Sequence, residues 1–147
     1  MGSVFDNKVF LVTITSWALV QGIKVTRGVI QERKFNFKWL IGTGGMPSSH
    51  AAGATALAAS CGLHTGFDSV LFALATVFAL VTMFDAQGVR RSAGQQAAIL
   101  NQIIDDMYWR QQFQADRLKE LVGHTPIQVL VGGVLGIVFA CFFYSIW

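Results

Sequence analysis

Gly44-Gly45-Met46-Pro47-Ser48-Ser49-His50 leads directly into a run of small residues that extends to Leu63. Glycines let the backbone approach a ligand closely, and Pro47 suits the first position of a helix. Free amides at a helix start favour anions, because the helix dipole adds positive charge there. Helices rich in Ala, Gly and Ser pack backbone to backbone inside membrane bundles. The stretch predicts a buried helix, 47–63, that begins beside an anion-binding turn or, alternatively, a plain serine-capped start.

The composition is that of a membrane protein. Hydrophobic residues make up 53% of the 147 residues and charged residues 13%, with a mean hydropathy of +0.51. Soluble domains have roughly 25% charged residues. We therefore expect a single membrane domain, 1–147, and no nucleic-acid partner despite a pI near 9.1. Cys61 and Cys141 are isolated in apolar segments, without disulfide or metal spacing.

Four segments are apolar enough to enter or cross the bilayer: 9–23, 47–63, 69–84 and 127–147. We expect the first to be a retained helix rather than a signal peptide. The last carries Gly132-xxx-Gly136, a pattern of close helix packing. Residues 92–122 are helix-prone but too polar to span. These features predict an all-α integral membrane helical bundle of about four transmembrane helices plus a cytoplasmic amphipathic helical segment, lying on the surface or capping the bundle.

The basic residues predict the orientation of the bundle. With four crossings, every Lys and Arg except Lys8 falls on one side. The positive-inside rule makes that side cytoplasmic and places both termini on the opposite face.

Two further polar stretches fall on the same side as the Gly44–His50 turn. Gly123-His124-Thr125-Pro126-Ile127-Gln128-Val129 precedes the last apolar helix, and Asp85-Ala86-Gln87-Gly88-Val89-Arg90-Arg91 follows the third. Ionisable residues at the ends of membrane helices often only extend their charges to the interface. Two histidines that both open helices on one side favour a functional site instead.

A family resemblance rests on these three stretches taken together. Met46-Pro47-Ser48-Ser49-His50 resembles the Pro-Ser-Gly-His motif of the type 2 phosphatidic acid phosphatase and vanadium haloperoxidase superfamily. His124-Thr125-Pro126-Ile127-Gln128-Val129, with glycines behind it, resembles that superfamily's His-aromatic-Pro-x-Asp-Val segment. The order GGMPSSH, DAQGVRRSAGQQAAILN, GHTPIQV is similar to a small divergent branch, and the resemblance covers roughly residues 34–136.

The resemblance implies an acid phosphatase-like membrane hydrolase of a lipid phosphate or isoprenoid diphosphate. His124 would match the nucleophile that forms a phosphohistidine, and His50 the acid that protonates the leaving oxygen. Phosphate oxygens would be held by residues from three places: Ser48, Ser49, Arg90 or Arg91, and Lys34 or Lys38. Arginine suits this role because its planar fork binds phosphoryl oxygens in pairs.

The sequence also departs from the family pattern. The first motif lacks its closing Arg-Pro, and Arg91 lies 33 residues before His124 rather than six. Gln128 stands where the family has the aspartate that orients the nucleophilic histidine, and a neutral amide cannot stabilise an imidazolium as a carboxylate does. Asp85 is the candidate to replace that carboxylate in space. These departures leave open an alternative, a non-catalytic phosphate-binding, lipid-binding or assembly protein descended from such phosphatases.

The remaining polar residues are expected to have ordinary roles. We expect His64 to be a solvated turn histidine, and the carboxylates at 105–106 to lie on the polar face of the surface helix rather than bind a metal. No cofactor is expected. The expected partners are the lipid bilayer and an amphiphilic phosphate substrate, with homo-oligomer formation left open.

Overall fold

The computed structural model describes residues 3–33, 37, 45–109 and 123–147. A short 3-10 helix, η1 (Val4–Asp6), precedes five α-helices: α1 (Lys8–Glu32), α3 (Ser49–Thr65), α4 (Val70–Gln87), α5 (Val89–Trp109) and α6 (Pro126–Ile146). No strand occurs in these described ranges. The all-helical class expected from the sequence is confirmed.

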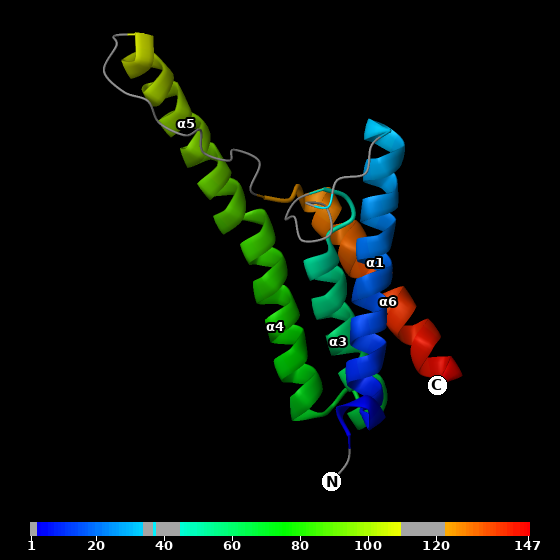
Figure 1. Ribbon diagram of the computed structural model, residues 1–147. Helices are drawn as coiled ribbons and strands as arrows, with labels where there is room; N and C mark the ends of the chain where they lie inside the picture. The colour runs from blue at the N-terminus through cyan, green and yellow to red at the C-terminus, as the bar shows by residue number, and fades with distance from the viewer. Residues whose placement is uncertain (1–2, 34–36, 38–44, 110–122) are drawn as a thin grey trace.

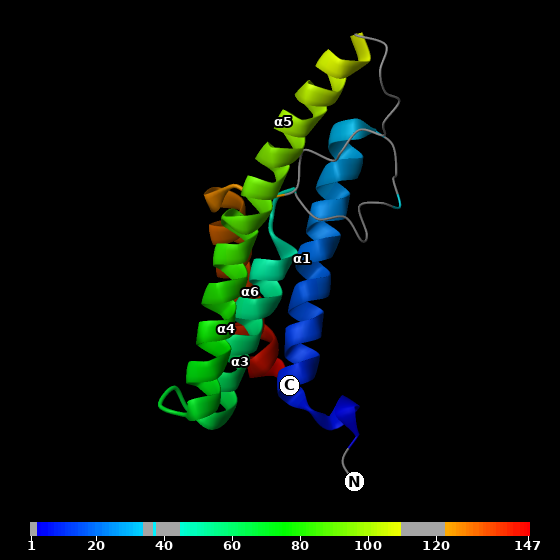
Figure 2. The same cartoon turned by 90° about the vertical axis from the view of Figure 1, so that its left-hand side faces the viewer.

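α3 is the central helix of the bundle. It packs against α1, α4 and α6, and α1 also contacts α6. The chain alternates in direction, with α1 and α4 running one way and α3 and α6 the other (Figures 1 and 2). The starts of α3 and α6 therefore lie at the same end as the close of α1 and of α4. We call this the histidine end, because it carries His50 and His124.

Three helical stretches of the described chain are long and apolar enough to cross a membrane: Lys8–Glu32, Val70–Asp105 and Pro126–Ile146. α3 has only 17 residues, but it runs between them from the histidine end to the opposite end. Large apolar side chains such as Leu74, Phe78 and Val81 on α4 are exposed. Such a surface is stable only against lipid, so the protein is an integral membrane helical bundle.

α1 contains the apolar segment 9–23 and continues through the amphipathic stretch after it to Glu32. One element differs from the sequence-based expectation. α5 continues the line of α4 past Gly88 and projects beyond the bundle rather than lying across its end (Figures 1 and 2). Residues 110–122 of the predicted surface segment lie outside the described residues.

α6 approaches α3 at backbone distance through two glycines. A Cβ placed on Gly132 would collide with the backbone of Ser48, and one placed on Gly136 with the backbone of Ala52. Beside them, the Thr55 hydroxyl on α3 donates across the interface to the Gly133 carbonyl at 2.9 Å. The Gly-xxx-Gly pattern therefore marks the tightest described contact between helices, and it lies directly behind the Ser48 turn.

We expect Gly132→Ala to destabilise the protein by about 1–3 kcal/mol, because the new methyl group forces α6 away from the Ser48 carbonyl. Gly133→Ala is the matched control, since its Cβ would meet only side-chain atoms of Thr55 and Met83, at 3.4 and 3.5 Å. Thermal unfolding in detergent measures both variants. Equal melting temperatures for the two would contradict the close α3–α6 contact.

Candidate functional site

The turn before α3 is held by Ser48. Ser48 caps the helix, its side-chain oxygen accepting from the Ala51 amide at 3.4 Å, and it is fully buried. α3 therefore begins at Ser49, and Pro47 precedes the cap rather than occupying the first helical position that the sequence suggested. The Ser48 amide donates to the Gln128 carbonyl at 3.1 Å, which ties this turn to α6. Gly45, just upstream, has a φ of +87°, a conformation that glycine adopts without strain.

The turn before α6 is a capping box. The Thr125 hydroxyl accepts from the Gln128 amide at 3.4 Å, and the Gln128 side-chain oxygen accepts from the Thr125 amide at 3.0 Å. Pro126 occupies the first turn, where its missing N–H costs nothing. This reciprocal pair fixes the backbone on which His124 sits.

His124 is anchored from two sides. Its amide donates to the Ala86 carbonyl at the end of α4, at 3.1 Å, and its ring Nδ1 lies 3.3 Å from the side-chain oxygen of Gln128. The side chain is 3% exposed. Because an amide oxygen only accepts, this contact places the proton of the neutral ring on Nδ1. Nε2 then carries the lone pair and is the nitrogen that can act as a base or nucleophile.

His50 faces His124 from the first turn of α3. Their ring centroids lie 6.5 Å apart, with the planes tilted by 54°. His50 is half-buried and so is more open than its partner. The two rings are therefore near neighbours at the starts of α3 and α6.

For the other candidate site residues that the structure describes, it gives the position of the backbone or the burial. Ser49 is buried beside Ser48. Asp85 precedes Ala86, whose carbonyl binds the His124 amide, so it belongs to the end of α4 that meets this turn. The backbone of Arg90 and Arg91 opens α5 just beyond, but their side chains lie outside the described part of the chain, as do Lys34 and Lys38 entirely.

Lys24 is a cation at this end that the sequence did not distinguish. Its side-chain carbons lie against Gly45, with Cε 3.4 Å from the position a Cβ would take there. In the sequence it was one of five cations between the first two apolar segments. No sequence signal distinguishes it from the other four, because its place depends on which turn of α1 meets Gly45.

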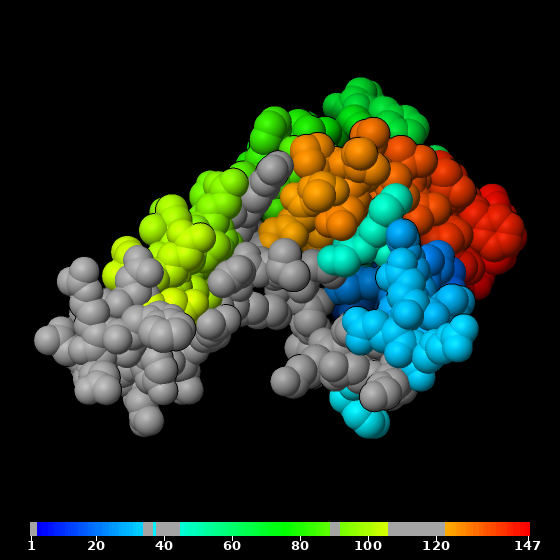
Figure 3. All heavy atoms as spheres, turned by 90° about the horizontal axis from the view of Figure 1, so that it is seen from above, coloured from blue at the N-terminus to red at the C-terminus, as the bar shows by residue number. Residues whose placement is uncertain are grey.

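Figure 3 views the histidine end from above. The start of α6, in orange, lies beside the cyan turn that precedes α3, and the end of α1, in blue, lies on the other side of that turn. The paired imidazoles and the capped start of α3 lie at this end, and Lys24 of α1 contacts the turn that precedes α3. Such a set can bind an anion and exchange a proton with it.

The opposite end of the bundle is closed by a different contact. His64, predicted to be a turn residue in solvent, lies in the last turn of α3, with Nδ1 3.0 Å from the Tyr144 hydroxyl on α6. The Lys8 ammonium stands 4.0 Å from the centre of the Tyr144 ring. This cluster joins α1, α3 and α6 far from the site; His64 is exposed, as expected, but it lies in the helix rather than in a turn.

These features define an integral membrane helical protein with two histidines paired at one end of its bundle. The chain belongs to the divergent PAP2 family, which matches residues 5–139. It is similar to the uncharacterized membrane protein YuiD of Bacillus subtilis (strain 168), with 41% identity over 145 residues, covering 91% of this chain and 92% of that protein. No solved structure matches the chain.

We expect Thr125→Val to lower the free energy of unfolding by about 1 kcal/mol, because it removes the hydroxyl that caps α6 while keeping the side-chain volume. Thr125→Ser retains the oxygen and is expected to stay near wild type. Chemical denaturation in detergent compares them. If both variants lose equal stability, the capping contact is not what holds the His124 turn.

Proposed function

We propose that this protein is a membrane phosphatase that hydrolyses a lipid phosphate or isoprenoid diphosphate through a phosphohistidine on His124. The observation that carries the proposal is the facing pair His50 and His124, with ring centroids 6.5 Å apart. Membership of the divergent PAP2 family and the resemblance of GGMPSSH and GHTPIQV to the phosphatase motifs support it. The site lies at the end of membrane helices, where the headgroup of an amphiphile would be located.

In the first step, Nε2 of His124 attacks phosphorus and forms the P–N bond while the bond to the leaving oxygen breaks. His50 donates its proton to that oxygen, which departs as an alcohol or, from a diphosphate, as a phosphate monoester. In the second step, water attacks phosphorus, His50 takes the water proton, and the P–N bond breaks. Inorganic phosphate leaves, and both histidines return to their starting states.

The surrounding groups would stabilise the charge that builds on the phosphoryl oxygens. Amides at the α3 start and the Lys24 ammonium provide positive potential, and Arg90 or Arg91 would add the bidentate fork. We place this site on the cytoplasmic face, because all cations but Lys8 fall on its side of the bundle.

Gln128 favours a second candidate function, phosphate or lipid binding without turnover. Its neutral oxygen holds Nδ1 of His124 at 3.3 Å and simultaneously accepts from the Thr125 amide. A shared amide orients the ring but stabilises the developing imidazolium less than a carboxylate. On this reading the site retains anion affinity and lacks hydrolysis.

We expect His124→Asn to abolish phosphate release from long-chain lipid phosphates in detergent, because no phosphohistidine can form. His50→Asn should slow release by roughly 10²–10⁴-fold for alkyl esters. It should slow release much less for an aryl ester, whose leaving oxygen needs no proton. Labelled substrate should leave acid-labile, alkali-stable phosphate on wild type and none on His124→Asn.

His64→Asn is the matched control, since His64 lies at the opposite end of α3. Phosphate release by His124→Asn equal to that of wild type would overturn the nucleophile assignment. Anion binding that is lost on Arg91→Ala, with no release from any protein, would favour the binding function.

We expect Lys24→Met to raise KM about tenfold with a smaller change in kcat, because methionine keeps the apolar stem against Gly45 and removes only the charge. Lys8→Met, at the far end of the same helix, is the control. Steady-state kinetics of the two variants provide the measurement, and an unchanged KM in Lys24→Met would exclude a substrate contact.

A further inference from the structure

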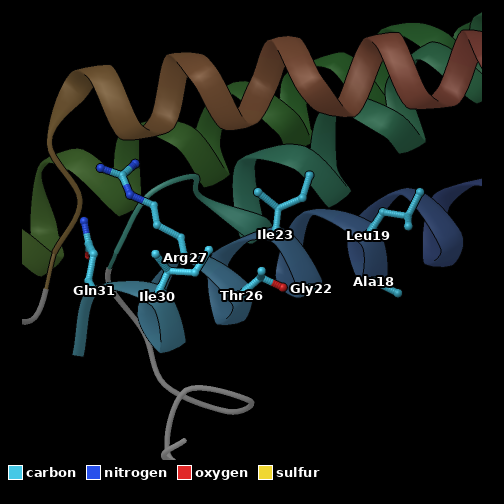
Figure 4. Close-up of a pocket in the computed structure, with 8 residues that line it drawn as sticks. All are labelled: Ala18, Leu19, Gly22, Ile23, Thr26, Arg27, Ile30 and Gln31. Atoms are coloured by element: carbon cyan, nitrogen blue, oxygen red, sulfur yellow. The ribbon is translucent and has the colours of Figure 1, made fainter. Parts of the chain in front are cut away.

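Lipid can cover most of the exposed apolar side chains of the described helices, but not those of α5. Leu19 and Ile23, on the face of α1 drawn in Figure 4, belong to a helix long and apolar enough to span the bilayer. α5 instead projects past the starts of α3 and α6 (Figures 1 and 2). There Ile99, Leu100 and Ile103 are each about half exposed. These three side chains need a different cover.

α5 extends beyond the hydrocarbon layer. Together, α4 and α5 form a stretch of 36 residues up to Asp105, whereas one crossing needs about 20. Arg90 and Arg91 open α5 directly after the apolar helix α4. Two adjacent arginines mark the edge of the hydrocarbon, because a charge inside it is costly. Ile99 lies two helical turns after Arg91, about 12 Å further along the axis. Its side chain is therefore in water.

The exposed side of α5 has the spacing of a surface that pairs with another helix. Four exposed residues follow one another at intervals of four, three and four: Ser92, Gln96, Ile99 and Ile103. We name them the Ile99 face. Such heptad spacing keeps one stripe of a helix against a partner helix. On the opposite side of α5, Ala97 and Asn101 are buried. Only one side of this helix is therefore open.

The chemistry of the Ile99 face complements itself. No charged residue occurs from Ser92 to Ile104. The face therefore offers nothing to an acidic or basic partner, and it lacks the cations with which surface helices bind anionic lipid headgroups. The side-chain amide of Gln96 both donates and accepts, so it can pair with its own equivalent. Isoleucines meeting their equivalents bury apolar surface on both sides.

The membrane aligns two copies for this contact. Copies inserted in one bilayer with the same orientation carry α5 out of the same side, so equivalent residues reach the same height. A twofold axis between them brings each residue of the Ile99 face against its own equivalent. Four residues on one helix bury far less than the roughly 800 Å² per partner of a standard interface. Confinement in one membrane raises the effective concentration, which favours a second copy over a partner in solution.

We propose that two copies of this protein associate through the Ile99 face, with their α5 helices parallel. The association stands apart from the proposed function, because neither His50 nor His124 takes part in it. It assigns a role to the part of the described chain that leaves the bundle.

Disulfide cross-linking in native membranes tests the pairing. The full chain, with Cys61 and Cys141 replaced by alanine, receives one new cysteine at a time. Ile99→Cys and Ile103→Cys should yield several-fold more oxidised dimer than Gln102→Cys. Residue 102 is also exposed, but it lies about a quarter-turn around the helix, and a disulfide needs Cα atoms within about 7 Å. Equal dimer at all three positions, or none at 99 and 103, overturns the proposal.

Charge substitutions test the same face with both native cysteines in place. Ile99→Glu combined with Ile103→Glu should weaken association of donor- and acceptor-labelled copies in proteoliposomes by about tenfold or more, because like charges then meet. Gln95→Glu combined with Gln102→Glu is the matched control, since it adds the same charge to α5 away from the face. All four side chains are exposed, so unfolding temperatures should stay unchanged. Equal association of the two double variants contradicts the pairing.

A bilayer contact would give a different result. A fluorophore on Ile99→Cys is quenched by lipids with brominated acyl chains only if α5 lies against the membrane. Quenching no stronger than on Gln102→Cys, together with the cross-link, supports the second copy. Strong quenching at residue 99 without a cross-link assigns the face to lipid and overturns the proposal.

Discussion

The backbone contact between α3 and α6 is the constraint on which the rest of the structure depends. Gly132 and Gly136 let α6 lie against the carbonyls of Ser48 and Ala52, and a Cβ at either place would collide with them. This contact fixes the depth at which the two helices begin relative to each other. The Ser48 amide can then reach the Gln128 carbonyl, and the two helix starts form one continuous surface. The close contact thus brings the start of α3, which carries His50, beside the turn that carries His124.

The two ends of the bundle hold different sets of polar contacts. At the opposite end, His64, Tyr144 and Lys8 satisfy one another and join three helices. At the histidine end, one polar group can make two different contacts at the same time. Gln128 closes a capping box and orients an imidazole with the same oxygen. Such double use explains how 147 residues, most of them apolar, can support a polar site without a separate domain.

Much of this arrangement could be predicted from the sequence, because its signals are local. Apolar runs gave the membrane helices, and Pro126 after Thr125 marked the start of α6 to within one residue. The features that could not be predicted depend on how the helices contact one another in the folded chain. The drop in hydropathy at Gly88 suggested a helix on the surface, whereas the backbone continues from α4 into α5.

The same holds for the candidate site: residues within short motifs could be predicted, whereas residues brought in by helix packing could not. The histidines could be found because each opens a helix within a short motif, and sequence order places both on one side. The choice among lysines could not be made, because it depends on which turn of α1 meets Gly45, and no sequence pattern encodes that register. Once Lys24 is placed there, the helical repeat puts Arg27 about one turn further along α1, so these two cations lie in consecutive turns near the histidine end.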